Sequence, residues 1–321
     1  MRILVTGGAG FIGSHLCERL IGNGHVVTAI DNFSTGRASN LTKLKDSTNF
    51  TLVEGSILDT KVLSPLINDV DYVFHLAAAV GVFNIVNNPL ASLLTNIRGT
   101  ENVLEAAHTT KTPVFLTSSS EVYGKNVSDS LRESDDRILG SPVTLRWSYS
   151  EAKAIDESLA YAYFVERKLE TRIVRFFNTV GPRQLGAYGM VVPRFVKAAL
   201  TNQPITIYGD GNQSRCFAHV YDVIDAVLAI AFADNSIGKV INIGNDFEIS
   251  INGLAKKIIQ ETGSKSEIVY VPYSEAYGDG FEDMERRVPN IDLINQLVGW
   301  KPKRDLSMMI SDIAVEMNKS S

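Results

Sequence analysis

The sequence predicts a doubly wound α/β fold, in which helices cover both faces of a parallel sheet, followed by a smaller mixed lobe. The first observation is an alternation, through residues 1–180, of short β-branched segments with longer segments whose apolar positions recur at helical spacing. The second is a glycine-rich turn, VTGGAGFIG (5–13), between the first such strand and the first such helix. Right-handed crossovers then place helices on both faces of the sheet.

Six strands are expected in the first part of the chain, over 2–6, 25–31, 50–55, 72–77, 113–119 and 171–177. Helices are expected over 12–22, 87–108 and 148–168. After Gly181 the predicted elements become shorter: helices near 193–201, 219–233 and 250–262, strands over 205–209 and 239–244, and a loop-rich stretch over 264–300. Since no Pro-, Gly- or Ser-rich linker intervenes, we expect a cofactor-binding domain over 1–180 and a substrate-binding lobe over 181–321 that is interleaved with the main sheet.

Composition restricts the possible partners. The 321 residues are 45% apolar and 21% charged, which is ordinary for a globular protein. A formal charge of −5 gives no basic surface for nucleic acid. The two cysteines, Cys17 and Cys216, predict neither a disulfide framework nor a metal site and agree with a reducing cytoplasm. The N-terminal apolar stretch is interrupted by four glycines, so we expect neither a signal peptide nor a membrane span.

The glycine-rich turn predicts a dinucleotide site. Gly7 permits the tight turn, Gly10 lets the backbone approach a pyrophosphate, and Gly13 allows close packing of helix on strand. Asp31 ends the second predicted strand, 18 residues after Gly13, where its carboxylate can accept the ribose hydroxyls of NAD. That carboxylate would repel the 2′-phosphate of NADP, and no arginine directly follows it. The predicted cofactor is therefore NAD.

Other residues are expected around the dinucleotide because they lie on the glycine-rich turn or at the ends of predicted strands. They are Phe11, Ile12, Asn32, Ser56, Ile57, Leu76, Ala77 and Ala78. His75, in contrast, is expected to be a packed histidine at a strand end.

Tyr149 and Lys153 are the predicted catalytic pair. They lie four residues apart on a predicted helix, so their side chains project from one face. A phenol with a pKa near 10 is a poor base, but an adjacent ammonium and a positive nicotinamide ring favour its ionised form. Such a base can deprotonate a sugar hydroxyl while hydride leaves the same carbon for NAD. A hydroxyl from 117–120 would share the proton.

Together these motifs resemble the extended short-chain dehydrogenases/reductases that modify nucleotide sugars, the NAD-dependent epimerases, dehydratases and decarboxylases. The resemblance covers essentially the whole chain. The matching segments are TGGAGFIG (6–13), DNFSTGR (31–37), HLAA (75–78), SSSEVYG (118–124), YSEAK (149–153), RFFNTVGPR (175–183) and SRCFAHVYDV (214–223). One departure is Ser56, where many members carry an acidic residue.

The resemblance implies an enzyme that oxidises a sugar at C4 with NAD, acts on the 4-keto intermediate and reduces it again. It implies that Ser119, with Ser120 beside it, supplies the hydroxyl partner of Tyr149. It further implies that the nucleotide sugar, most simply a UDP-sugar, is bound by basic and amide side chains. These are Asn178, Arg194, Arg215 and Arg287.

Two features resemble the UDP-glucuronate decarboxylases within this family. Glu121 precedes the Val-Tyr-Gly turn, where simple 4-epimerases carry a small or hydroxyl residue and where both the 4,6-dehydratases and the UDP-glucuronate decarboxylases carry Glu. A carboxylate there could move a proton near C5. Segments 138–153, with the Arg146-Trp147 pair, and 276–303, with Arg287, resemble UDP-apiose/xylose synthase and the aminoarabinose-pathway decarboxylase. In those enzymes the arginine matching Arg287 reaches the reacting sugar. A decarboxylase, a type of lyase, is therefore the first interpretation.

The alternatives stay open. The small, apolar segment 77–89 is closer to the 4-epimerases, which are isomerases, so a 4-epimerase is second and a 4,6-dehydratase third. A non-catalytic NAD-binding protein would be expected to lose Tyr149 or Lys153. The helices predicted over 87–108 and 148–168 carry apolar residues beyond one core face, and the family often pairs these helices across a two-fold axis. We therefore expect a homodimer.

Overall fold

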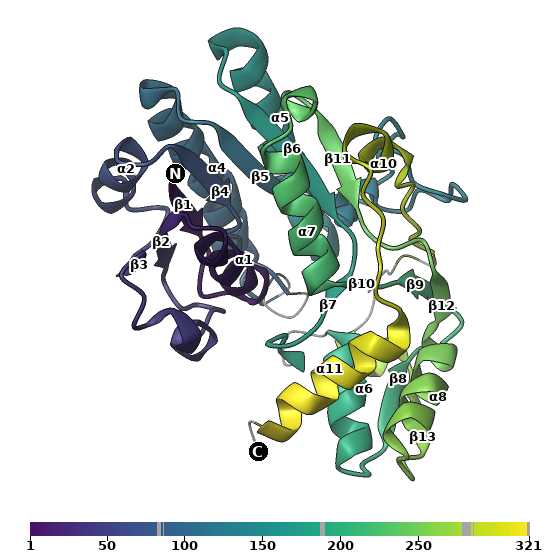
Figure 1. Cartoon of the computed structure of the whole chain (residues 1–321). Coiled ribbons are helices and arrows are strands. Elements are labelled where there is room, and N and C mark those ends of the chain that lie inside the picture. The colour runs from purple at the N-terminus through teal and green to yellow at the C-terminus, as the bar shows by residue number, and fades with distance from the viewer. Residues whose placement is uncertain (82–84, 86, 187–189, 278–283, 285, 320–321) are drawn as a thin grey trace.

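The computed structural model describes residues 1–81, 85, 87–186, 190–277, 284 and 286–319 (Figure 1). Its main sheet has seven parallel strands in the order β11-β6-β5-β4-β1-β2-β3. Their bounds are β1 Arg2–Thr6, β2 Val26–Asp31, β3 Phe50–Glu54, β4 Tyr72–His75, β5 Val114–Ser119, β6 Thr171–Phe176 and β11 Val240–Ile243. From β1 the sheet extends through β2 to β3 on one side and through β4 and β5 to β6 on the other. Ligands of such sheets bind at this switch point.

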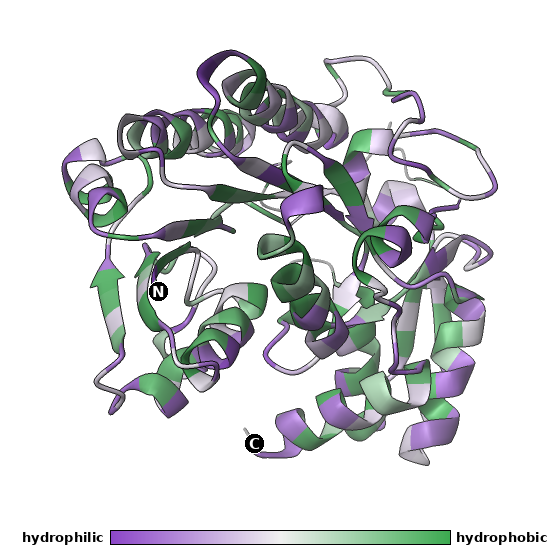
Figure 2. Ribbon diagram, turned by 45° about the horizontal axis from the view of Figure 1, so that its top comes forward, coloured by the Kyte–Doolittle hydropathy of each residue, from purple (hydrophilic) through white to green (hydrophobic). Residues whose placement is uncertain are grey.

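Helices cover both faces of the sheet (Figure 2). On one face lie α2 (Thr60–Asn68), α4 (Pro89–Thr110) and α5 (Ser148–Arg167), and on the other α1 (Phe11–Gly22), α7 (Val220–Ala231) and α10 (Asp292–Val298). The buried strands supply both cores by alternation: in β1, Ile3 and Val5 face α1 and α7, whereas Leu4 packs with α2 and α4. This is the doubly wound fold that the sequence predicts.

The ends of the helices follow local sequence signals. Pro89, whose fixed φ suits the first turn, opens α4. Ser250 caps α8 (Ile251–Thr262) by accepting the Gly253 N–H at 3.0 Å, and Gly263 ends that helix with φ +64°.

The smaller lobe has its own core of apolar side chains. It contains β7 (Thr179–Val180), α6 (Val191–Leu200), β8 (Ile205–Tyr208), β9 (Ser214–Cys216), β10 (Ala218–His219), β12 (Glu248–Ser250), α8, β13 (Ile268–Val271), α9 (Tyr273–Tyr277) and α11 (Leu306–Lys319). Its strands form three pairs: β7 with β10, β8 with β13, and β9 with β12. The stretch 264–300, expected to be loop-rich, holds β13, α9 and α10, and its other described residues lie outside helices and extended strands.

The division of the chain at residue 180 stays a proposal. The strand β11 and the helices α7 and α10 follow that position in sequence yet join the main sheet and its helices. A smaller lobe that is interleaved with the main sheet explains why these later elements belong to that sheet and its helices. Short 3₁₀ helices complete the fold near the switch point: η1 (Ala38–Leu44), η2 (Ser120–Tyr123) and η3 (Leu145–Trp147). Among the described residues, no helix has both the length and the apolar composition needed to cross a bilayer.

Candidate active site

A cavity of about 700 Å³ lies at the carboxyl ends of the sheet strands and extends to the smaller lobe. Every site residue expected from the sequence lines it. On the cofactor side these are Gly7, Gly10, Phe11, Ile12, Gly13, Asp31, Asn32, Ser56, Ile57, Leu76, Ala77 and Ala78. On the substrate side they are Ser119, Ser120, Glu121, Tyr149, Lys153, Asn178, Arg194, Arg215 and Arg287. Their individual roles are proposals that rest on the geometry below.

The backbone of the glycine-rich turn packs closely against itself and against the backbone that follows β4. Gly7 has φ +72°, and a Cβ on it would lie 2.8 Å from the amide nitrogen of Ala77. A Cβ on Gly13 would lie 2.1 Å from the carbonyl oxygen of Gly7, so both positions require glycine. Gly10 precedes α1, and no side chain caps that helix. The N-terminus of α1 thus presents backbone N–H groups to the cavity, which suits a pyrophosphate.

Asp31 is held in place at the end of β2. Its Oδ2 accepts the Ala9 N–H at 2.9 Å and its Oδ1 accepts the Phe33 N–H at 2.8 Å. The carboxylate is largely buried and has lone pairs left for the two hydroxyls of a ribose. This donor and acceptor set fits NAD and disfavours a 2′-phosphate.

Ser118 and Ser119, at the end of β5, have different partners. Ser118 Oγ donates to Glu157 Oε1 at 2.5 Å, and Glu157 also pairs with Arg175 through both carboxylate oxygens. Ser118 is therefore part of the buried framework. Ser119 accepts the Glu121 N–H at 3.2 Å and forms a hydrogen bond with the Tyr149 side chain. The structure thus brings Ser119 together with Tyr149, as the resemblance implies.

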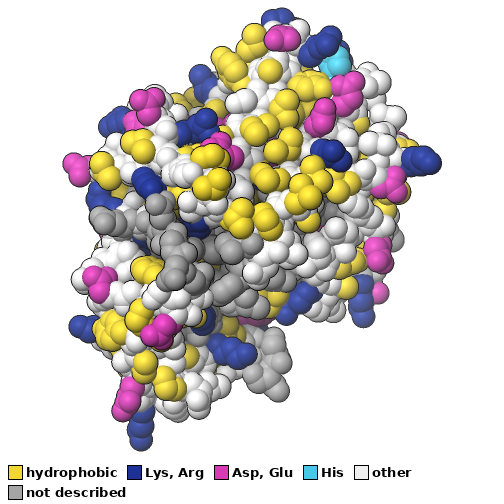
Figure 3. Space-filling view, turned by 180° about the vertical axis from the view of Figure 1, so that it is seen from behind, with side chains coloured by type: hydrophobic (Ala, Val, Ile, Leu, Met, Phe, Trp, Pro, Cys, Tyr) yellow, Lys and Arg dark blue, Asp and Glu magenta, His cyan; other side chains and the backbone are white. Residues whose placement is uncertain are grey.

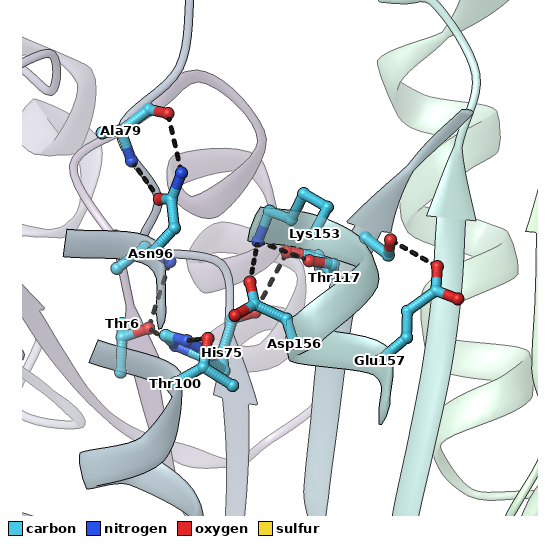
Figure 4. A network of polar contacts seen from close by, with 11 residues as sticks. Thr6, His75, Ala79, Asn96, Thr100, Thr117, Lys153, Asp156 and Glu157 are labelled. Carbon is cyan, nitrogen blue, oxygen red and sulfur yellow. Dashed lines mark hydrogen bonds and ion pairs between the residues drawn. The ribbon is translucent and has the colours of Figure 1, made fainter. Parts of the chain in front are cut away.

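Lys153 is buried between Thr117 and Asp156 (Figure 4). Its Nζ donates to the Thr117 carbonyl at 3.0 Å and lies 3.1 Å from Asp156 Oδ2. Burial raises the pKa of Tyr149, Lys153 opposes this effect, and the carboxylates of Glu121 and Asp156 add to it. The expectation that the lysine brings the pKa of this phenol down is therefore only partly met by the protein's own charges, because two carboxylates act against the ammonium.

Glu121 lies between two arginines. Its Oε2 is 2.6 Å from Arg146 Nη1 and its Oε1 is 2.5 Å from Arg287 Nη1. Burial alone would raise the pKa of Glu121, but Arg146 and Arg287 together hold it well below its usual range. Arg287 also donates to Asn178 Oδ1 at 2.7 Å. In this arrangement Glu121 is an ionised acceptor, so moving a proton at C5 would first require one arginine to release it.

Arg146 was not among the site residues expected from the sequence. It lies on η3, three residues before Tyr149, and is buried in the wall of the cavity. The signal available was its place in a segment similar to the decarboxylases. Arg287, the other arginine that contacts Glu121, is buried. The adjacent Arg286 instead lies at the surface and pairs with Glu248 and Asp129.

The far end of the cavity carries further cationic side chains. The Arg194 guanidinium lies 4.2 Å above the Tyr208 ring, and its buried Nε has no partner among the described residues. Arg215 is also buried in this wall. Fixed guanidinium groups of this kind suit a diphosphate.

His75 is packed, as expected from the sequence. It is 1% exposed, and its ring nitrogens contact the hydroxyls of Thr6 and Thr100. Two segments used in the resemblance reach beyond the described residues: 77–89 includes 82–84 and 86, and 276–303 includes 278–283 and 285.

Comparison with known proteins agrees with this site. The model of the NAD dependent epimerase/dehydratase family matches residues 3–244. Over 302 residues the chain is 42% identical to the UDP-N-acetyl-alpha-D-glucosaminuronate decarboxylase of Bacillus cytotoxicus, covering 94% of this chain and 92% of that protein. Over 303 residues it is 37% identical to UDP-glucuronic acid decarboxylase 1 of Xenopus tropicalis, covering 94% of this chain and 68% of that protein.

Solved structures show the same fold with bound ligands. A UDP-glucuronic acid 4-epimerase from Bacillus cereus, in complex with UDP-glucuronic acid and NAD, aligns with a TM-score of 0.90 at 30% identity over 100% of both chains. A UDP-glucose 4-epimerase from Thermotoga maritima, with UDP-glucose, aligns with a TM-score of 0.90 at 31% identity over 100% of this chain and 99% of that one. The resemblance and the cofactor predicted from the sequence are confirmed. The chain belongs to the NAD-dependent epimerase/dehydratase family and is an enzyme whose cofactor is NAD.

Proposed function

We propose that the enzyme decarboxylates a UDP-linked hexuronate through a 4-keto intermediate. The observation that carries the proposal is the cluster of Glu121, Arg146 and Arg287 in the cavity wall. Arg287 contacts Glu121 through Nη1 and Asn178 through Nη2. Arg287 Nε is buried without a partner among the described residues, so it is a donor that a substrate oxygen could use.

The first step is oxidation at C4. Tyr149 removes the proton of the C4 hydroxyl, and Ser119, which is hydrogen-bonded to Tyr149, shares that proton and orients the oxygen. Lys153 stabilises the phenolate by its charge. When bound, NAD⁺ accepts the hydride from C4 and brings a positive charge into the cavity.

The second step is loss of CO₂. Oxidation at C4 makes the C6 carboxylate a β-keto carboxylate, so the electrons of the breaking C5–C6 bond pass to the C4 oxygen. Ser119 and Tyr149 can donate to that oxygen as its negative charge develops. Arg146 or Arg287 holds the carboxylate before it leaves. A proton from water then replaces CO₂ at C5, and C4 is reduced by return of the hydride removed in the first step, while Tyr149 returns its proton to the C4 oxygen.

The curated relatives differ at C2 of the sugar, since one is named for an N-acetylglucosaminuronate and the other for a glucuronate. Ala79, Val80 and Gly81, which line the cavity, are small enough to leave room for an acetamido group. We therefore include both UDP-glucuronate and UDP-N-acetylglucosaminuronate as candidate substrates.

A 4-epimerase is the second candidate. The same small residues would let a 4-keto sugar turn over and accept hydride on its other face. The similarity to two solved 4-epimerases supports this alternative. A 4,6-dehydratase is third, because Glu121 stands where those enzymes carry a carboxylate.

One experiment separates these functions. The enzyme is incubated with UDP-glucuronate, UDP-N-acetylglucosaminuronate and UDP-glucose, and the products are followed by mass spectrometry. Loss of CO₂ from either hexuronate supports the proposal; an unchanged mass with a new C4 epimer, or loss of water, contradicts it. Tyr149→Phe should lower turnover by roughly 10²–10⁴-fold. Tyr270→Phe, at an exposed tyrosine, should match the wild type.

We also propose that the enzyme is a cytoplasmic homodimer. Four exposed apolar side chains on α4 and α5, here called the α4–α5 patch, support the dimer: Leu90, Ile155, Tyr161 and Val165. Figure 3 shows hydrophobic side chains gathered on the face that these helices cover. An apolar face of this kind suits burial against a second copy. The two buried free cysteines agree with a reducing compartment.

A further inference from the structure

The carboxylate of Asp156 lies beside the catalytic lysine, and the proposed mechanism does not use it. Asp156 is fully buried on α5, three residues after Lys153, and its Oδ2 lies 3.1 Å from Lys153 Nζ. The lysine side chain is 3% exposed and that of the aspartate 0%. A buried ion pair adds little to stability compared with apolar residues of the same volume. The pair is therefore more readily explained by the chemistry of Lys153 than by stability.

Asp156 is itself fixed by a chain of hydrogen bonds that starts above the glycine-rich turn (Figure 4). The Ala77 N–H donates to Thr6 Oγ1 at 3.1 Å, and Thr6 Oγ1 lies 2.7 Å from His75 Nδ1. His75 Nε2 lies 3.2 Å from Thr100 Oγ1, and the Thr100 hydroxyl in turn acts on the Asp156 carboxylate and lowers its pKa.

The donors in this chain can all point one way. Burial lowers the pKa of His75 to about 3, so its ring is neutral and carries one N–H. With Thr6 donating to Nδ1, that N–H is on Nε2 and donates to Thr100, whose hydroxyl hydrogen is then directed at Asp156. A chain with aligned donors that ends on a carboxylate stabilises its negative charge. Burial raises the pKa of Asp156, whereas Lys153 and Thr100 both favour its ionised form.

We propose that Asp156 is a positioning residue that keeps Lys153 protonated and seated against the Thr117 carbonyl, and so sets the pH range in which Tyr149 acts as base. The inference rests on the proposed function in one respect, the role of Tyr149. Burial alone would lower the pKa of Lys153, whereas Asp156 opposes this and the pKa is raised. Asp156 also raises the pKa of Tyr149.

The other charged groups that the described residues place around the pair contact one another. They are Glu157 on α5, Glu121 on η2, Arg146 on η3, Arg175 on β6 and Arg287 in the C-terminal part of the chain. Glu157 is paired with Arg175, and Glu121 is held by the other two arginines. His75 on β4 is neutral. Among the described residues, Asp156 is the carboxylate that contacts Lys153 directly.

The test is Asp156→Asn, which keeps the size of the side chain and removes its charge. Without the carboxylate, Lys153 loses its proton at lower pH, and Tyr149 ionises at lower pH while the lysine is still charged. Both limbs of the pH profile of kcat should therefore move to lower pH, by about one unit, since a neighbouring charge in a protein shifts a pKa by one to three units. An unmoved profile, even with lower overall activity, or a shift to higher pH would overturn the proposal.

The matched control is Asp222→Asn. Asp222 is also a buried aspartate in an ion pair, with Arg304, but it lies outside the cavity wall. This variant should lose thermal stability and keep the pH profile of the wild type. If Asp156→Asn does not fold, Thr100→Val, which removes the hydroxyl between His75 and Asp156, should give a smaller shift in the same direction. No shift in that variant would then count against the proposal.

A second readout does not depend on turnover. The Cε signal of Lys153, identified as the NMR signal missing in Lys153→Met, is titrated in wild type and in Asp156→Asn. The lysine should titrate at least about one unit lower in the variant, and equal titration would contradict the inference. If the wild type converts none of the tested nucleotide sugars, the proposed function fails, while this titration still decides the role of Asp156.

Discussion

Arg287 Nη1 lies 2.5 Å from Glu121 Oε1, a contact that joins side chains 166 residues apart in sequence. Glu121 follows the end of β5, whereas Arg287 lies between α9 and α10, so the contact links the main sheet to a distant segment of the chain. It places an ionised carboxylate and a guanidinium together in the wall of the cavity. The chemistry that follows C4 oxidation is therefore expected to depend on both residues.

Arg287→Lys should slow the step that follows oxidation. Lysine keeps the charge but cannot contact Glu121 and Asn178 at once through a planar fork. We expect product formation to fall by about a hundredfold, the order found when one preorganised donor to a developing charge is removed. The measurement is rapid-mixing absorbance of NADH together with product mass. Arg286→Lys is the matched control, because Arg286 is the adjacent arginine at the surface. Equal losses in the two variants would contradict the role of Arg287.

Glu121 holds Arg146 and Arg287 in the cavity wall, where one of them binds the substrate carboxylate. Glu121→Gln should therefore slow the loss of CO₂ while oxidation at C4 continues, so that NADH accumulates. If the variant equals the wild type in every step, the role given to Glu121 is wrong.

The same variant has a predicted effect on stability. Because Arg146 and Arg287 depress the pKa of Glu121 in the folded state, the carboxylate stabilises the fold above the unfolded pKa, about 4.3. This contribution is lost as the pH falls below that value. Glu121→Gln should therefore lose less stability than the wild type between neutral pH and about pH 3, as followed by thermal unfolding. If the thermal stability of Glu121→Gln depends on pH in the same way as that of the wild type, Glu121 is not ionised in the folded protein.

Asp31→Ser should weaken NAD binding by at least about tenfold, since hydrogen bonds to a charged group contribute about 1.5–3 kcal/mol. The shorter side chain also cannot accept both ribose hydroxyls. The measurement is isothermal titration of the protein, freed of nucleotide, with NAD and with NADP. NADP binding should improve relative to NAD, because the repelling carboxylate is gone. Asp46→Ser, at an exposed aspartate, is the control. An unchanged preference for NAD over NADP would remove Asp31 from the cofactor site.

Much of this site could be predicted because its signals are local in sequence. The glycine-rich turn joins β1 to α1, and Asp31 ends β2. Tyr149 and Lys153 lie one turn apart on α5. The partners of Glu121 could not be derived in this way. Arg146 lies on the short 3₁₀ helix η3, which has no periodic pattern, and Arg287 comes from a distant segment. The pairing of Asp156 with Lys153 was also missed, since two charged residues three apart on a helix are usually solvent-exposed.

The α4–α5 patch leads to the last prediction. Val165 is 44% exposed on α5, and Tyr161, one turn earlier on that helix, is 51% exposed. If two copies bury these side chains against each other, a carboxylate at position 165 would be desolvated without a partner in the interface. Val165→Asp should therefore convert the dimer to a monomer, as measured by light scattering at several protein concentrations. Val269→Asp is the matched control, because Val269 is 42% exposed but lies on β13 in the smaller lobe. A wild-type protein that is monomeric, or a Val165→Asp variant that stays dimeric, would place the interface elsewhere or remove it.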